Sequence, residues 1–196
     1  SQQLLELSFS DLTHRSNKAA NVLKNHGMVK ADRIMILLPK IPELFIYFLG
    51  ALKLGLNCCI LFSSIGDDTL SDRILDTGTK LIISNNKFKY RLSKILPNLS
   101  NGFKVFLIDE NSQIGNVYGI QNDFLHSSGE FATPFTSSNQ DSHFHFTSGS
   151  TGKPKGVQHI HGSFQSHVAS FDEVMQPDNN DIYWCTADPG WVTGVT

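Results

Sequence analysis

The stretch FTSGSTGKPKG, residues 146–156, concentrates groups that bind phosphate. Glycines let a backbone approach an anion closely and adopt the positive φ angles that turn successive N–H groups toward it. Hydroxyl and ammonium side chains add further donors, namely Thr147, Ser148, Ser150, Thr151, Lys153 and Lys155. The composition predicts a phosphate-binding loop, which Gly149, Gly152 and Gly156 would allow to fold over its ligand.

Two other interpretations of this loop need to be weighed. A Walker A loop requires Gly, four residues, and then Gly-Lys-Ser/Thr. Here two residues separate Gly149 from Gly152, and Lys153 is followed by proline, so a P-loop NTPase is disfavoured. A flexible Ser/Gly surface connection remains an alternative on composition alone.

The segments on either side of the loop predict where it lies. Residues 141–147 alternate in the manner of a strand, and residues 161–175 show apolar residues at helical spacing. The alternation places two histidines on one strand face and two phenylalanines on the other, namely His143 with His145 and Phe144 with Phe146. The order strand, loop, helix puts the loop outside the carboxyl end of a strand, where open parallel sheets bind ligands.

Upstream, short apolar runs alternate with amphipathic segments. Residues 5–12 predict a strand ending in a cap, with a helix from Ser10 or Asp11 to about residue 25. Further strands are predicted at 33–39, 57–62, 80–84 and 103–109, and further helices at 44–55, 67–78 and 89–96. Alternation of this kind defines an α/β fold, a parallel sheet flanked by helices and joined by right-handed crossovers. Leu75 is expected to face inward, and Cys58 and Cys59 to point to opposite faces of their strand.

Composition bounds the class of protein. The 196 residues can form one large domain or two small ones, and 40% apolar and 17% charged residues indicate a globular chain. A formal net charge of −2 gives no support to a nucleic-acid or anionic-membrane partner. Three cysteines are too few for a disulfide framework, which favours a reduced, cytoplasmic setting.

Two segments bear on organisation. Residues 41–62 form the most apolar run, but charges and a turn at Gly55 favour a core helix and strand over a membrane span. No targeting signal is visible. Residues 110–141 are polar and weakly periodic, which predicts a surface connection with one short helix at 120–126 and a possible boundary between two halves.

Other candidate groups have plainer interpretations. The pairs His143/His145 and His159/His161 suggest zinc, but no cysteine or carboxylate nearby completes a ligand set. Structural histidines are therefore favoured. Arg73 is interpreted as structural, with a carboxylate as its expected partner. A basic group is interpreted as a solvated helix face, with an approach to a CoA nucleotide left open; it comprises Lys87, Lys89, Arg91 and Lys94.

Residues 146–157 resemble the signature phosphate loop of the adenylate-forming enzymes, which include acyl-CoA synthetases, luciferases and peptide-synthetase adenylation domains. Every specified position of the pattern aromatic-Thr-Ser-Gly-Ser/Thr-Thr-Gly-x-Pro-Lys-Gly is met. YWCTADPGWVTG, residues 183–194, is similar to a segment of acetyl-CoA synthetases and their short- and medium-chain relatives. Residues 8–55 resemble the opening of the same enzymes, so the resemblance covers essentially the whole chain.

The resemblance implies a two-step ligase. A carboxylate attacks the α-phosphorus of Mg·ATP to give acyl-AMP and pyrophosphate, and the thiol of coenzyme A then displaces AMP. Thr147 and Lys155 would be the catalytic groups, with residues 147–152, Lys155 and Gly156 holding the ATP phosphates. Lys153 occupies the variable position and is expected to face solvent. Trp191, Val192 and Thr193 would line the acyl pocket, although a core aromatic remains an alternative for Trp191.

The same resemblance predicts what this stretch lacks. Family members are longer and carry later motifs for adenine, ribose and Mg²⁺, as well as a small C-terminal domain with a catalytic lysine. Residues 1–196 are therefore predicted to be an incomplete N-terminal domain that is inactive alone and self-associates. A non-catalytic nucleotide-binding or interaction module stays open, because LFSSIGDDTL and Pro189 depart from the family pattern.

Overall fold

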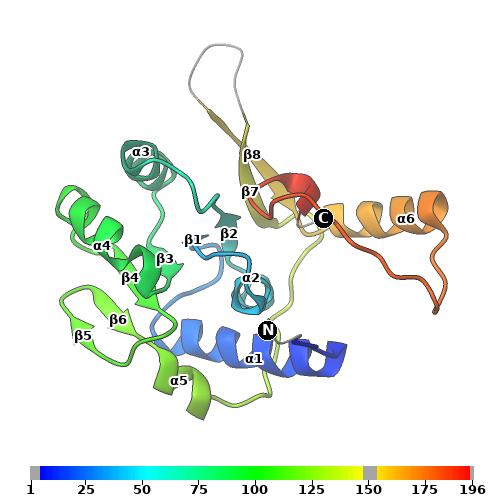
Figure 1. Ribbon diagram of the computed structural model, residues 1–196, viewed down its shortest axis with the longest axis horizontal. Coiled ribbons are helices and arrows are strands. Elements are labelled where there is room, and N and C mark those ends of the chain that lie inside the picture. Colours follow the sequence, from blue (N-terminus) through cyan, green and yellow to red (C-terminus); the bar gives the residue numbers. More distant parts are fainter. Residues whose placement is uncertain (1–4, 148–153, 195–196) are drawn as a thin grey trace.

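The computed structural model describes residues 5–147 and 154–194, and within them the chain forms an eight-stranded sheet flanked by helices (Figure 1). The strand order is β5-β6-β4-β3-β1-β2-β7-β8. Neighbours from β6 to β7 run parallel, whereas β5 and β8 pair antiparallel at the two edges. The strands are β1 Arg33–Ile36, β2 Asn57–Ile60, β3 Leu81–Ser84, β4 Lys104–Leu107, β5 Gln113–Ile114, β6 Val117–Gly119, β7 Asp141–Thr147 and β8 Lys155–Ile160. The predicted α/β class is confirmed.

Helices cover both faces of the sheet. Helices α1, α2 and α5 pack on one face, while α3 and α4 pack on the other (Figure 1). Alternation along β2 sends Cys58 into the first core and Cys59 into the second, as predicted. The helices are α1 Phe9–Asn25, α2 Pro42–Leu54, α3 Asp67–Thr77, α4 Asn86–Ile95, α5 Gln121–His126 and α6 Ser163–Met175, with short 3₁₀ turns η1 Leu96–Asn98 and η2 Val192–Gly194.

Local sequence signals set the start of α1 and the ends of α2 and α3. The Ser8 hydroxyl accepts a hydrogen bond from the Asp11 N–H at 3.0 Å, and the Asp11 carboxylate accepts one from the Ser8 N–H at 3.0 Å. This capping box starts α1 at Phe9, so the strand predicted over residues 5–12 is wrong. Helices α2 and α3 end at Gly55 and Gly78, whose φ angles of 79° and 62° suit glycine.

The long apolar run is confirmed as a core helix and strand. Residues 41–62 contain α2 and β2, both largely buried. No helix in the described part of the chain combines the length and the hydropathy needed to cross a bilayer. On α3, Leu70 and Ile74 are buried as predicted, but Leu75 is 52% exposed, because it lies at the edge of the buried stripe.

The polar segment after β4 holds more structure than its composition indicates. Its short helix, α5, is confirmed. Strands β5 and β6 were missed because two or three residues are too few to establish a period. Since β6 pairs with β4, part of this segment belongs to the sheet. The predicted boundary near residues 110–141 stays a prediction.

The region after the glycine-rich loop differs most from expectation. The predicted step from loop directly to helix is wrong, because β8 intervenes and returns antiparallel along β7. Helix α6 follows, and within the described residues none of its side chains is buried. Val168, one of the residues at helical spacing in this segment, is 61% exposed. Figure 1 shows α6 projecting away from the helix-covered sheet.

Candidate functional site

The two ends of the glycine-rich loop meet at the tip of a β-hairpin. Thr147 is the last residue of β7, Lys155 is the first residue of β8, and the two are partners across the ladder. Both side chains are exposed. Residues 148–153 lie outside the described part of the chain, and they comprise the predicted site residues Ser148, Gly149, Ser150, Thr151 and Gly152 together with Lys153. Gly156, also predicted, pairs with Phe146.

This hairpin tip lies at the edge of the sheet where ligands bind in parallel folds. Strand β7 runs parallel to β2, and β2 runs parallel to β1, so all three end at the same edge. The sheet therefore places Thr147 and Lys155 on the carboxyl side of its strands. The antiparallel return of β8 fixes the separation of the loop's two ends, which the predicted strand-to-helix connection would not have done.

The segment around Trp191 packs against the same edge. The Trp191 ring contacts the Phe62 ring edge-on, with centroids 5.3 Å apart. Lys40 follows β1, and its ammonium lies 3.4 Å from the Asp188 carboxylate. Trp191 is 53% exposed, so the core-aromatic interpretation is wrong. Phe62, which follows β2, is a contact that sequence reasoning missed, because only the tertiary structure brings it to Trp191.

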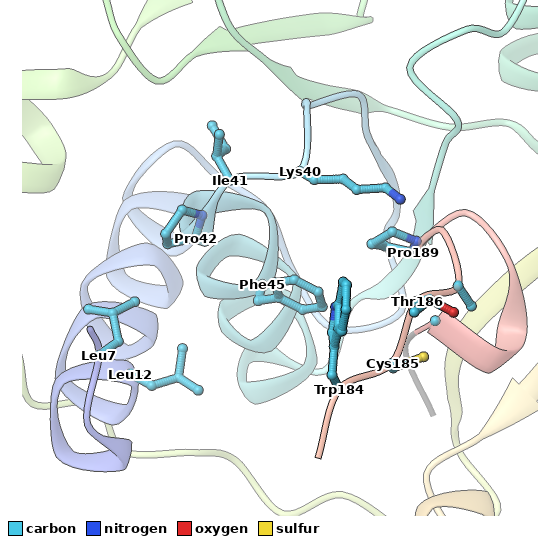
Figure 2. Close-up of a pocket in the computed structure, with 12 residues that line it drawn as sticks. Leu7, Leu12, Lys40, Ile41, Pro42, Phe45, Trp184, Cys185, Thr186 and Pro189 are labelled. Carbon is cyan, nitrogen blue, oxygen red and sulfur yellow. The ribbon is translucent and has the colours of Figure 1, made fainter. Parts of the chain in front are cut away.

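A cavity of about 580 Å³ opens beside this segment (Figure 2). One side is formed by the loop into α2 and by α1, and the other by residues 184–194. Its volume falls in the range of small-molecule pockets, and its lining is mostly apolar. The lining includes Ile41, Pro42, Phe45, Trp184, Thr186 and Pro189. Trp191 and Thr193 do not line this cavity; Thr193 is exposed and its carbonyl accepts from the Cys185 thiol at 3.2 Å.

A histidine cluster lies at the base of the hairpin. His143 and His145 are buried on β7, and the His143 ring stacks on that of His159 from β8 at 4.6 Å. The His143 Nδ1 lies 2.9 Å from the Ser142 hydroxyl, while its Nε2 has no partner among the described atoms. Burial, reinforced by the neighbouring imidazoles, lowers the pKa of His143 to about 3. These rings are therefore neutral packing groups near pH 7.

The described residues hold no group of three or more His, Cys, Asp or Glu placed to bind a metal ion. His143 and His159 do not form a metal site because their rings are stacked in parallel, so their nitrogens do not point toward a common position. The spacing of the histidines in the sequence thus identified residues that do lie together, and in the fold their rings pack against one another.

Two of the four basic residues on α4 contact neighbouring loops. The Lys89 ammonium lies 2.6 Å from the Glu110 carboxylate, and the Arg91 guanidinium lies 2.7 Å from that of Asp67. Arg91 also donates to the carbonyls of Ser63 and Ile65. The Arg91 bonds fix the loop between β2 and α3. Lys87 and Lys94 are exposed, so the solvated-face interpretation holds for these two lysines and not for Lys89 and Arg91.

The fold and the site together define an α/β protein with a glycine-rich hairpin loop at the carboxyl edge of a parallel sheet. The sequence matches the family described as AMP-binding enzyme over residues 3–196, so the chain belongs to that family. The resemblance to adenylate-forming enzymes seen in the motifs is thereby confirmed.

Individual relatives agree with this assignment. The chain is 34% identical over 191 residues to an acetyl-coenzyme A synthetase of Bacillus subtilis, covering 96% of this chain and 33% of the relative. It is 32% identical over 203 residues to that of Rhodobacter capsulatus, covering 96% and 31%. A crystal structure of Brucella canis acyl-CoA synthetase superposes with a TM-score of 0.87 at 27% identity, covering 98% of this chain and 35% of that one. The chain spans about a third of the length of these relatives.

Proposed function

We propose that this chain supplies the N-terminal part of an AMP-forming acid–thiol ligase that acts on a short carboxylate. In the first step a carboxylate oxygen bonds to the α-phosphorus of Mg·ATP and pyrophosphate leaves. In the second step the thiol of coenzyme A bonds to the acyl carbon and AMP leaves. The substrates are ATP, a carboxylate such as acetate, and coenzyme A, and the family membership and the acetyl-coenzyme A synthetase relatives support this assignment.

The observation that carries the proposal is the pairing of Thr147 with Lys155 across the hairpin. It sets a hydroxyl and an ammonium on the two sides of the loop's opening, where they can hold opposite sides of a polyphosphate. Positioning and charge stabilisation supply most of the catalysis in phosphoryl transfer. Lys155 would neutralise the departing pyrophosphate, and Thr147 would orient it.

The remaining roles follow the predicted residues. The loop from Ser148 to Gly152, with Gly156 after it, would wrap the β- and γ-phosphates. Mg²⁺ would arrive bound to ATP. Residues 191–193 would border the acyl group and the path of the thiol, and the packing of Trp191 on Phe62 supports a place for them at this edge. A reducing, cytoplasmic setting suits the free thiols of Cys58, Cys59 and Cys185.

The test is ATP–pyrophosphate exchange by the whole protein that carries this sequence, with acetate, propionate and butyrate. Lys155→Ala should slow exchange about tenfold to a hundredfold, because a charge-assisted bond to phosphate contributes roughly 1.5–3 kcal/mol. Lys153→Ala is the matched control, since the family pattern leaves that position variable, and it should change the rate much less. Equal effects of the two substitutions would contradict the assignment of Lys155. No carboxylate-dependent exchange by the unsubstituted protein would favour a non-catalytic nucleotide-binding module.

A further inference from the structure

Arg73 reaches from helix α3 to the strand that carries the phosphate loop. Leu70 and Ile74 bury one side of α3 in the core and so fix the orientation of the helix. From the same turn, the Arg73 guanidinium lies over the ring of Phe146, with its Cζ 4.3 Å from the ring centroid. Phe146 is the residue immediately before Thr147, where the loop begins.

Phe146 is held from two sides. Its second aromatic neighbour is Phe144, two residues earlier on the same face of β7, with ring centroids 5.9 Å apart in an edge-on arrangement. Phe144 is itself buried in the core formed with α3 and α4. The guanidinium of Arg73, the ring of Phe146 and the ring of Phe144 therefore connect helix α3, the end of β7 and the core in one continuous contact.

The electrostatic situation of Arg73 is unlike that of the other arginines. Arg15 and Arg91 pair with carboxylates, and Arg33 donates to the Thr77 carbonyl at 3.0 Å. The Arg73 guanidinium has neither the predicted carboxylate partner nor a hydrogen bond to any described residue, and its Nε is buried. Burial lowers its pKa, and the nearby Cys59 thiol, whose own pKa is raised to about 12 by burial, is neutral.

Burying part of a cation without a counter-ion lowers the stability of the fold, unless another interaction of the cation compensates for the lost hydration. Here the planar face of the guanidinium packs on the ring of Phe146. Its charge lies beside the opening of a loop that is proposed to bind the phosphates of ATP. A lysine could not replace both properties, because an ammonium is compact and strongly hydrated whereas a guanidinium stacks on aromatic faces.

We infer that Arg73 is a positioning residue for the phosphate loop: it fixes Phe146 and, through it, the end of β7 that presents Thr147 to ATP. This inference rests on the proposed function. It names a helix of the scaffold, outside the loop motif, as the support that keeps the loop's first hydroxyl in place before nucleotide binds.

The experiment compares Arg73→Gln and Arg73→Lys in the whole protein by exchange kinetics at varied ATP. A cation–π contact is worth about twofold to thirtyfold in an equilibrium constant, so Arg73→Gln should raise KM for ATP by that factor with a smaller change in kcat. Arg73→Lys should recover part of the loss. Arg15→Gln is the matched control, because it removes the same charge from the opposite face of the sheet, and its KM for ATP should not change.

A double-mutant cycle separates positioning from simple stability. Phe146→Leu removes the ring, so Arg73→Gln should raise KM for ATP less in the Phe146→Leu background than alone. Additive effects on KM, or a lower melting temperature with KM unchanged, would overturn the inference. If Lys155→Ala slows exchange while Arg73→Gln leaves KM unaltered, the inference fails and the proposed function stands. If neither substitution affects exchange, the proposed function fails as well.

Discussion

The helix-covered sheet formed by α1 to β4 and the hairpin region formed by β7 to η2 are built in different ways. In the first, each inner strand is buried on both faces and each flanking helix contributes a buried stripe. In the second, β8 is mostly exposed, α6 has no fully buried side chain among the described residues, and Trp184 and Trp191 lie at the surface. Yet the second region carries nearly all the side chains with candidate chemistry.

The comparison shows that the rigid part of this chain and the part with the candidate site residues are different regions. Dense apolar burial gives the sheet a fixed carboxyl edge, which is the reference frame for any bound ligand. The outer strand β8 and helix α6, in which no described side chain is fully buried, add little to this rigidity. The two regions are joined through the β2–β7 ladder and the buried histidines. Substitutions in the two regions should therefore have unequal effects.

The largest effect should come from the centre of the sheet. Phe106 on β4 is fully buried, and Phe106→Ala should lower the free energy of unfolding of this chain by about 3–5 kcal/mol, because it leaves a cavity. Val168→Ala on α6 is the control from the other region and should stay within about 0.5 kcal/mol. Urea denaturation measures both. Comparable losses of unfolding free energy would show that α6 is as well packed as the sheet, which would contradict the difference in packing between the two regions.

The junction between the regions should respond to acid. His143 has a pKa of about 3 in the folded chain against an ordinary value of 6.5. The unfolded chain therefore binds more protons below pH 6.5, so the stabilisation is complete above that pH and is lost as pH falls toward 3. Between pH 6.5 and 4.5 the loss should be about 2 kcal/mol.

His143→Phe tests this, because it keeps an aromatic ring and removes the titration. The imidazoles of His145, His159, His161 and His167 face the same site, and no carboxylate pairs with any of them among the described residues. The unfolding free energy of the variant should therefore fall less steeply over this pH range than that of the unsubstituted chain. Parallel curves would mean that His143 is not the acid-sensitive group.

A smaller effect is expected where the first two helices cross. A Cβ added at Gly50 would lie 2.7 Å from the Cβ of Ala19 and 3.0 Å from the Ser16 carbonyl oxygen. Gly50→Ala should therefore destabilise the chain by about 1–3 kcal/mol. Gly156→Ala in the hairpin is the matched control, since no described atom lies within 4 Å of its Cβ position, and it should be nearly neutral. Equal melting temperatures for the two variants would show that α1 and α2 can separate to admit the methyl group.

Much of the fold could be predicted from local sequence patterns. Short apolar runs located the strands β1 to β4, period 3.6 located the helices between them, and glycines marked the ends of α2 and α3. These features depend on residues close together in the chain, so a window of sequence contains their cause. The loop motif likewise identified the family, because all of its specified positions lie within one short stretch of consecutive residues.

The tertiary structure alone decided how the site is assembled. Residues 155–160 have no strong strand pattern, and they form β8 because β7 offers them an unpaired edge. Trp191 meets Phe62, and Arg73 meets Phe146, across more than seventy residues in each case, so no local window could predict either contact. The sequence by itself determined which groups can bind phosphate. Long-range packing determined which edge presents them and which scaffold side chains hold them there.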